Sequence, residues 1–141
     1  MEEKVFVDRE EELEALKQAL DRQGAELIIL YGRRRIGKTR LLQEIGKIVS
    51  LDLAVMLEDA DYSYNLKKLS EAASKRFNYP SFKPESFREL FEKLPENTTI
   101  AIDEYSYMAN SAGEFQAIWE EVAKRKKLKI ILSGSLIRIM E

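Results

Sequence analysis

The chain has 141 residues, of which 45% are hydrophobic and 34% charged, and its formal net charge is −2. This composition is typical of one globular domain, and the near-neutral charge gives no overall attraction to nucleic acid or to an anionic membrane. The absence of cysteine and histidine excludes disulfides, thiolate metal sites and histidine-based catalysis. No apolar run reaches the roughly 18 residues of a membrane helix and no signal-peptide pattern opens the sequence, so we expect one cytoplasmic domain over residues 1–141.

The chain opens with a predicted helix. Asp8 is a candidate N-cap, and Leu13, Leu16 and Leu20 follow at the spacing of one helix face. An unbroken apolar run, Leu-Ile-Ile-Leu-Tyr, then occupies residues 27–31. Such a run is typical of a strand that is buried on both faces, as in a parallel sheet.

The segment after this strand carries the most specific pattern in the chain. Residues 32–39, Gly-Arg-Arg-Arg-Ile-Gly-Lys-Thr, fit the phosphate-binding P-loop pattern G-x-x-x-x-G-K-S/T, and a predicted helix follows to about Val49. Backbone N–H groups of such a loop and the positive end of the helix cradle the phosphates of a nucleoside triphosphate. Lys38 would reach the β- and γ-phosphates, and Thr39 would offer its hydroxyl to Mg²⁺.

The alternative interpretation of this segment is a glycine-bounded turn whose basic residues face water. Three arginines occupy the variable part of the loop, where a phosphate or partner contact and a solvated basic rim both fit the pattern. The candidate nucleotide-binding residues are Gly32, Arg33, Arg34, Arg35, Ile36, Gly37, Lys38, Thr39 and Arg40.

The rest of the chain predicts strands that alternate with helices. Apolar runs predict the strands, and apolar residues three and four positions apart predict the helices. The predicted strands cover residues 53–57, 98–102 and 129–132, and the predicted helices cover residues 66–77, 87–94 and 115–122, with a turn at 133–135 and a further helix from 136. This alternation favours parallel β–α–β units with right-handed crossovers in one α/β domain.

Two acids, Asp103 and Glu104, directly follow the predicted strand 98–102. Because parallel sheets bind ligands at the carboxyl ends of their strands, these acids and the loop at 32–39 would share one edge. Asp103 would hold Mg²⁺ beside Thr39, directly or through water. Glu104 would orient and polarise the attacking water. The alternative is an acidic strand end in solvent.

Two polar segments near the end of the sequence each have two interpretations. A hydroxyl of Ser133 or Ser135 would contact the γ-phosphate or the attacking water, or the serines would form a plain turn. Ser133 therefore joins Glu104 and Lys38 as a candidate catalytic residue. The basic run at 124–127 suits either the negative end of a helix dipole or contact with nucleic acid.

Four segments together resemble the archaeal ATPase family, a branch of the AAA-related P-loop NTPases of the signal-transducing type. They are residues 6–13, 31–39, 102–105 and 132–135. The resemblance implies a three-layer α/β P-loop NTPase core with a mostly parallel sheet, in which the Ser133 strand separates the Asp103 strand from the P-loop strand. It implies ATP rather than GTP, because no Asn-Lys-x-Asp segment for guanine is present. It also implies Ser133 or Ser135 as the γ-phosphate sensor.

The resemblance has a limit at the end of the sequence. Such proteins continue beyond the fourth strand into a fifth strand, a small helical lid and often a winged-helix domain, whereas this sequence stops at Glu141. We therefore expect a fragment in which the fifth strand and the lid are missing. One edge of the P-loop strand would then be exposed, and an exposed edge invites dimerisation by strand pairing.

The function predicted from these features is that of an Mg-ATP-binding ATPase core. In the full-length protein, water held by Glu104 would attack the γ-phosphate, and Lys38 would stabilise the developing charge, whereas this chain alone would be weak or inactive. The alternative is a nucleotide-dependent switch or binding module for a protein or DNA partner, with little or no turnover. A third hypothesis keeps the loop only as a structural turn.

Overall fold

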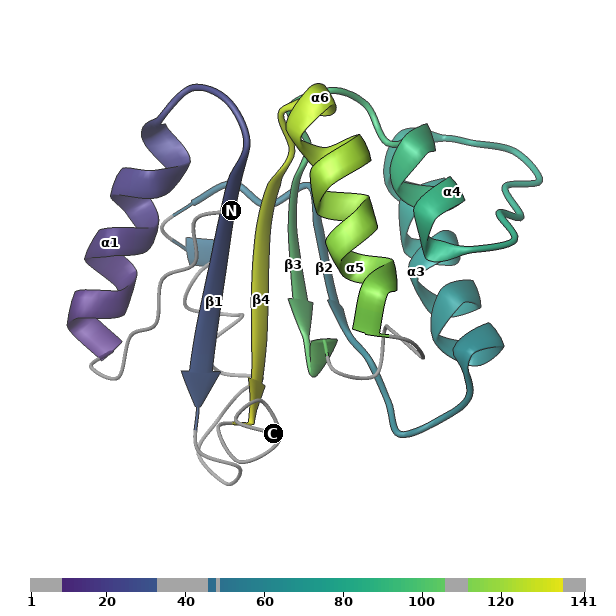
Figure 1. Cartoon of the computed structure of the whole chain (residues 1–141), viewed down its shortest axis with the longest axis horizontal. Coiled ribbons are helices and arrows are strands. Elements are labelled where there is room, and N and C mark those ends of the chain that lie inside the picture. The colour runs from purple at the N-terminus through teal and green to yellow at the C-terminus, as the bar shows by residue number, and fades with distance from the viewer. Residues whose placement is uncertain (1–8, 33–45, 48, 106–111, 136–141) are drawn as a thin grey trace.

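The computed structural model describes residues 9–32, 46–47, 49–105 and 112–135. Within these residues, four strands form one sheet that is flanked by helices (Figure 1). In chain order the elements are α1 (Arg9–Asp21), β1 (Glu26–Gly32), β2 (Leu53–Met56), α3 (Tyr62–Phe77), α4 (Phe87–Lys93), β3 (Thr99–Asp103), α5 (Ala112–Ile118), the π-helical turn η2 (Trp119–Ala123), α6 (Lys124–Lys126) and β4 (Lys129–Ser135). The predicted α/β class is therefore confirmed.

The strand order in the sheet is β1-β4-β3-β2, and each neighbouring pair is parallel. β4, which carries Ser133, separates β1 from β3, which ends at Asp103, as the resemblance implied. Because all four strands run in one direction, their carboxyl ends meet at a single edge, which we call the carboxyl edge. The opposite edge, where the strands begin, is the amino edge.

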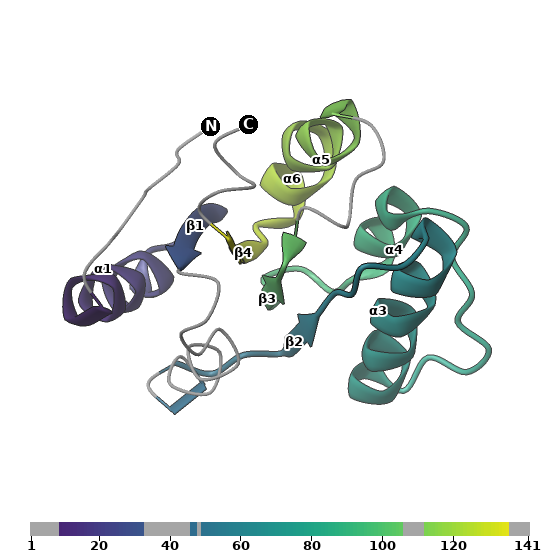
Figure 2. The ribbon, with the colours of Figure 1, turned by 90° about the horizontal axis from the view of Figure 1, so that it is seen from below.

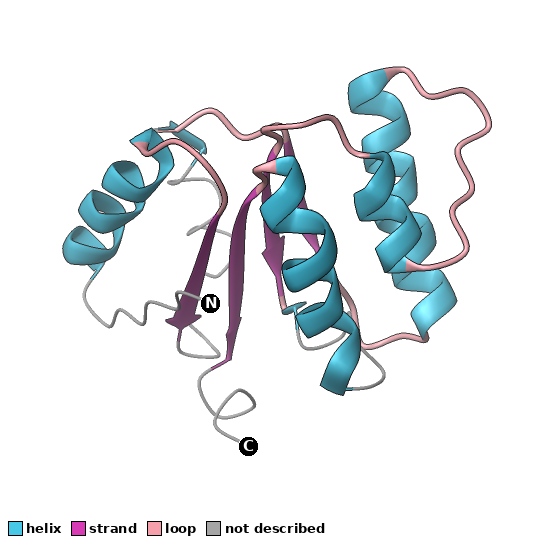
Figure 3. Cartoon of the chain, turned by 45° about the horizontal axis from the view of Figure 1, so that its top comes forward, coloured by secondary structure: helices cyan, strands magenta, loops and turns pink. Residues whose placement is uncertain are grey.

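Helices cover both faces of the sheet. Successive side chains of a strand point to opposite faces, and in β3 the isoleucines Ile100 and Ile102 belong to a larger apolar cluster, whereas Ala101 packs in a smaller cluster with Leu16 of α1. In Figure 2, α1 lies on one side of the sheet, and α3, α4, α5 and α6 lie on the other side. Figure 3 shows the same arrangement with the strands between the helices. These are the expected three layers.

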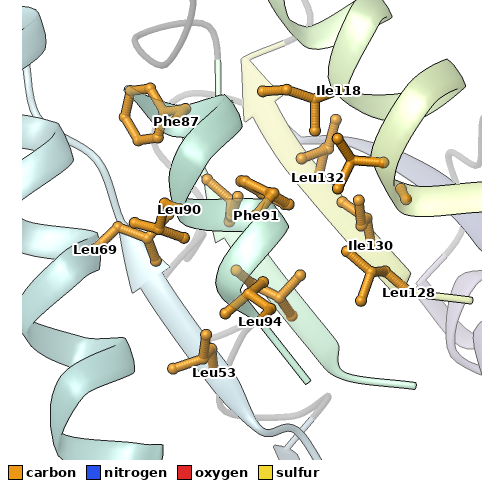
Figure 4. Packing of buried hydrophobic residues seen from close by; sticks show 14 of the residues in the cluster. Leu53, Leu69, Phe87, Leu90, Phe91, Leu94, Ile118, Leu128, Ile130 and Leu132 are labelled. Atoms are coloured by element: carbon orange, nitrogen blue, oxygen red, sulfur yellow. The ribbon is translucent and has the colours of Figure 1, made fainter. Parts of the chain in front are cut away.

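The larger cluster supplies most of the core. Leu69 of α3 and Leu90 and Phe91 of α4 pack with Ile130 and Leu132 of β4, and all five side chains are buried (Figure 4). Full burial of such a side chain contributes about 1.5–3 kcal/mol. Packing on this face therefore fixes the sheet, with its carboxyl edge, against the helices.

Side chains of the preceding residues begin α3 and α4. The Asp61 side chain accepts a hydrogen bond from the backbone N–H of Tyr64 at 2.9 Å, and the Ser86 hydroxyl accepts one from the N–H of Glu89 at 3.0 Å. These N-caps satisfy donors that a helix leaves unpaired in its first turn. Asn78 ends α3 in the left-handed conformation that Asn tolerates, with φ of 58°.

One predicted turn is wrong. Residues 133–135 continue β4 as a strand, and the pairing with β1 extends to Ser135 opposite Gly32. Serine and glycine favour turns locally, but backbone pairing along the whole of β1 overrides that preference, because strand propensity depends strongly on the neighbouring strand. The predicted N-cap at Asp8, the helix after the loop at 32–39 and the helix from 136 lie outside the described residues.

None of the described helices is both long enough and apolar enough to cross a lipid bilayer.

Candidate functional site

The register of the sheet brings the two predicted constellations to the carboxyl edge. Asp103 pairs with Ser133 across β3 and β4, and Ser135 pairs with Gly32 across β4 and β1. Gly32 is the first residue of the P-loop pattern. Neighbouring strands lie about 4.8 Å apart, so only about 10 Å of sheet separates the strand that enters this segment from the strand that ends in Asp103.

Asp103 is fully buried at the end of β3. Its Oδ1 accepts a hydrogen bond from the Ser133 hydroxyl at 2.9 Å and another from the backbone N–H of Glu104 at 2.8 Å. The N–H of Leu57 donates to the backbone oxygen of Asp103 at 3.0 Å, so the ladder between β2 and β3 continues up to this residue. A buried carboxylate is costly unless it is hydrogen-bonded or binds a cation. The structure therefore places a buried, hydrogen-bonded carboxyl group at the strand end where the sequence predicted an acid.

Glu104 follows in a left-handed backbone conformation, with φ of 56°. Such a conformation costs about 1–2 kcal/mol for a residue with a Cβ atom. Asn78 and Lys127, two other described residues with positive φ, follow helix ends, where this conformation commonly terminates a helix. Glu104 instead follows a strand. Backbone strain in such a position is typical of functional sites.

Ser133 lies in β4 with 3% of its surface exposed. The prediction gave its hydroxyl a contact with the γ-phosphate or the attacking water, and in the structure this hydroxyl donates to Asp103. The contact joins residues 30 positions apart in the sequence and depends on the register of β3 and β4. The catalytic assignment of Ser133 stays a prediction, while its contact with Asp103 is a property of the fold.

The sequence analysis missed a polar cluster beside this site, where the chain leaves β2. Oε2 of Glu58 accepts hydrogen bonds from Lys68 Nζ at 2.8 Å and from the Tyr64 hydroxyl at 3.0 Å, and Lys68 also donates to the backbone oxygen of Met56. Lys68, and then Tyr64, lower the pKa of Glu58 through these hydrogen bonds. The i, i+4 spacing of Tyr64 and Lys68 on a polar helix face was the available signal. Their acceptor, however, depends on how α3 packs against β2.

A second missed contact joins the first turns of three helices on the larger-cluster face. The Tyr62 hydroxyl of α3 donates to Oε2 of Glu114 in α5 at 2.6 Å and accepts from the backbone N–H of Phe87 in α4 at 2.9 Å. Burial, and then the hydrogen bond to Glu114, raise the pKa of Tyr62 to about 12. Tyr62 therefore links the helices that follow β2 and β3.

The basic run at 124–127 is largely engaged within the chain. Arg125 donates to both carboxylate oxygens of Glu92 at 2.8 Å, Lys124 pairs with Glu120 at 2.9 Å, and Lys126 donates to the backbone oxygen of Glu92. These contacts favour the structural interpretation of the run. A nucleic-acid partner stays a prediction.

The carboxyl edge suits Mg²⁺, which needs few protein ligands, better than a metal ion that is coordinated entirely by protein side chains. Within the part of the chain that the structure describes, no three His, Cys, Asp or Glu residues gather as metal ligands. Mg²⁺ is usually bound by one or two carboxylates together with substrate phosphates and water, and Asp103 provides a buried carboxylate of that type. The other predicted ligand, Thr39, lies outside the described residues, as do Arg33, Arg34, Arg35, Ile36, Gly37, Lys38 and Arg40.

The fold and the edge define a class of protein: a parallel α/β domain with the strand order expected of a P-loop NTPase-like core. Residues 6–137 match the family described as the ATPase domain found predominantly in Archaea, and the chain belongs to this family.

Two relatives come from the archaeon Methanocaldococcus jannaschii. One is an uncharacterized protein, 36% identical over 141 aligned residues that cover 96% of this chain and 31% of the relative. The other is an uncharacterized ATP-binding protein, 55% identical over 40 residues that cover 28% of this chain and 68% of the relative. The chain thus spans about a third of the first relative's length.

Proposed function

We propose that this chain is the nucleotide-binding core of an ATPase and that it binds Mg-ATP at the carboxyl edge. One observation carries the proposal: the sheet register places Gly32, where the P-loop pattern begins, and Asp103 on the same edge with a single strand between them. Membership of the ATPase domain family and the relative whose name includes ATP binding support the nucleotide assignment.

The proposed site divides the work among a few residues. Backbone N–H groups of residues 32–39 cradle the phosphates, and Lys38 neutralises charge on the β- and γ-phosphates. Thr39 and Asp103 would hold Mg²⁺, which would supply positive charge to offset that of the phosphates. Glu104 orients a water molecule in line with the γ-phosphorus and accepts a proton from it. The water oxygen bonds to the γ-phosphorus as the bond from that phosphorus to the bridging β-phosphate oxygen breaks, and ADP and phosphate leave.

Lys38→Ala tests the binding part of the proposal. Removing a charge-assisted contact to phosphate is expected to weaken Mg-ATP binding about 100-fold or more in calorimetry. Lys67→Ala is the matched control, because Lys67 is an exposed lysine on α3 and its removal leaves affinity unchanged. Equal affinity of Lys38→Ala and the wild-type chain would show that residues 32–39 are not the phosphate site.

Glu104→Gln separates hydrolysis from simple binding. The amide is nearly isosteric but does not accept a proton, so ATP affinity stays and turnover of the full-length protein falls at least about 100-fold. Glu58→Gln is the control at the same edge, because its carboxylate is already engaged by Lys68. If wild-type turnover is negligible and unchanged by Glu104→Gln, the protein is a nucleotide-dependent switch for a protein or DNA partner.

We also propose that β1 is available for pairing with a second copy. In the described sheet β1 pairs with β4 alone, and an unpaired strand edge is a template for another strand. Light scattering of the 141-residue chain tests this proposal, with a dimer mass expected and a monomer at high concentration as the contrary result. The cytoplasmic location stays a prediction.

A further inference from the structure

The hydrogen bond between Ser133 and Asp103 connects the two central strands at the carboxyl edge. The two residues are direct partners in the register of β3 and β4, and 3% and 0% of their surfaces are exposed. A hydroxyl has one proton to donate, and here that proton is donated to Oδ1 of Asp103 at 2.9 Å. A hydrogen bond to a carboxylate that is shielded from water is among the stronger ones.

The same carboxylate oxygen receives a second donor from the chain that follows β3. The backbone N–H of Glu104 donates to Oδ1 of Asp103 at 2.8 Å. Two donors on one oxygen oppose rotation of the carboxylate about its Cβ–Cγ bond. The second of these bonds also links the peptide between Asp103 and Glu104 to the carboxylate. Glu104 itself has a left-handed backbone conformation. Ser133 thus contacts the Asp103 carboxylate, which is also bonded to the backbone of Glu104.

We propose that Ser133 is a positioning residue for the cation site and not a contact to the γ-phosphate. Its hydroxyl orients the Asp103 carboxylate and acts on Mg²⁺ through it. Ser135, the other serine that the sequence offered for a phosphate contact, keeps that assignment as a prediction, and its backbone is paired with Gly32. This inference rests on the proposed function, since it assigns a role within the proposed Mg-ATP site.

The test is calorimetric titration of ATP and of ADP, each in excess Mg²⁺ and in EDTA, into the wild-type 141-residue chain and into Ser133→Ala. We expect Ser133→Ala to weaken Mg-ATP and Mg-ADP about tenfold alike and to leave both affinities in EDTA within about twofold of wild type. The Mg²⁺ concentration that half-saturates the ATP-bound protein should rise by a similar factor. A residue that only stabilised the fold would not change the Mg²⁺ dependence selectively.

Companion variants keep the test decisive. Ser133→Thr retains the hydroxyl and should keep the wild-type Mg²⁺ dependence. If the alanine variant does not fold, Ser133→Cys takes its place and should show the same selective loss, because a thiol is similar in size but is only a weak donor. Ser135→Ala is the matched control, and it should weaken ATP more than ADP.

Three results would overturn the inference: a loss in Ser133→Ala confined to ATP, a loss of equal size in EDTA, or no loss at all. A Ser133→Thr variant that folds and yet loses the Mg²⁺ dependence would overturn it as well. If the wild-type chain binds neither nucleotide, the proposed function itself fails, which is distinct from each of these outcomes.

Discussion

The two edges of the sheet use polar side chains in different ways. At the amino edge, Lys129 donates to the backbone oxygens of Arg22 and Gly24 just beyond α1, and Asp52 accepts from the backbone N–H of Thr99. Partial burial lowers the pKa of Lys129. Each charged group here satisfies backbone groups at the end of a helix or strand, which is a common way to stabilise a fold.

At the carboxyl edge, the polar groups contact one another beside a strained backbone. Asp103 is fully buried, Ser133 donates to it, and Glu104 follows in a left-handed conformation. Such an arrangement costs stability that the rest of the core must offset. The comparison teaches that one edge stabilises the fold, whereas the other holds the Asp103 carboxyl group with hydrogen bonds, as the proposed binding site requires.

The largest change in stability is expected behind the carboxyl edge, at Tyr62. Tyr62→Phe removes the donor to the Glu114 carboxylate and the acceptor of the Phe87 N–H, and should lower the free energy of unfolding by about 3 kcal/mol in urea titration. Tyr64→Phe is the matched control on the same helix, because Tyr64 is exposed. An equal effect of the two substitutions would contradict the structural role of the Tyr62 contact.

The same residue predicts a dependence on pH. The pKa of Tyr62 is raised from 10.0 to about 12 in the folded chain, so the protonated hydroxyl is favoured by folding. Between pH 10 and 12 the unfolded chain loses this proton before the folded chain does, and the stability that this group contributes is therefore complete below pH 10 and lost as pH rises to 12. Urea titrations at pH 9 and pH 11 should show a smaller decline for Tyr62→Phe than for wild type.

An intermediate effect is expected at the amino edge. Asp52→Ala leaves the N–H of Thr99 without its acceptor and breaks the ion pair with Arg76, and should lower the free energy of unfolding by about 2 kcal/mol. Nucleotide affinity should not change, and Asp52→Asn, which keeps an acceptor oxygen, should lose less stability. If Asp52→Ala weakened nucleotide binding without lowering the free energy of unfolding, the amino edge would not differ from the carboxyl edge in its role.

The smallest change in the free energy of unfolding is expected at two residues that share a left-handed backbone conformation, one at each edge. Lys127, which follows α6 and precedes β4, has φ of 58°, and Glu104 has φ of 56°. Lys127→Gly should raise the free energy of unfolding by about 1 kcal/mol, because glycine adopts this conformation without strain. Glu104→Gly should raise it less, since the burial of a partly buried side chain is also lost, and should reduce turnover as Glu104→Gln does. Urea titration and a turnover assay measure both effects, and a loss of turnover in Lys127→Gly would contradict the account.

The elements of the fold were predictable from local patterns, and their contacts were not. The apolar runs that became β1 and β3 identify buried strands because both faces of the sheet are covered. The strand order came from the resemblance to a family, because periodicity says nothing about which strands are neighbours. The predicted helix over 115–122 contains the π-helical turn that begins at Trp119, which a 3.6-residue period does not reveal.

In the candidate site, too, the positions of residues were predictable from the sequence and their contacts were not. The position of Asp103 at a strand end could be predicted from its sequence context. Its hydrogen bond with Ser133 could not, since it depends on the register between β3 and β4, and the pattern at 133–135 favoured a turn. The left-handed backbone of Glu104 has no local signal either, because the sequence offers neither glycine nor asparagine at that position.

The most direct test of the central claim is whether Mg-ATP stabilises the folded chain. At a hundredfold excess over its dissociation constant, a ligand that binds only the folded state adds about 2.7 kcal/mol to the free energy of unfolding. We predict a corresponding rise in melting temperature with Mg-ATP for the wild-type chain and none for Lys38→Ala. An unchanged melting temperature of the wild-type chain in millimolar Mg-ATP would contradict the account and leave residues 32–39 as a structural turn.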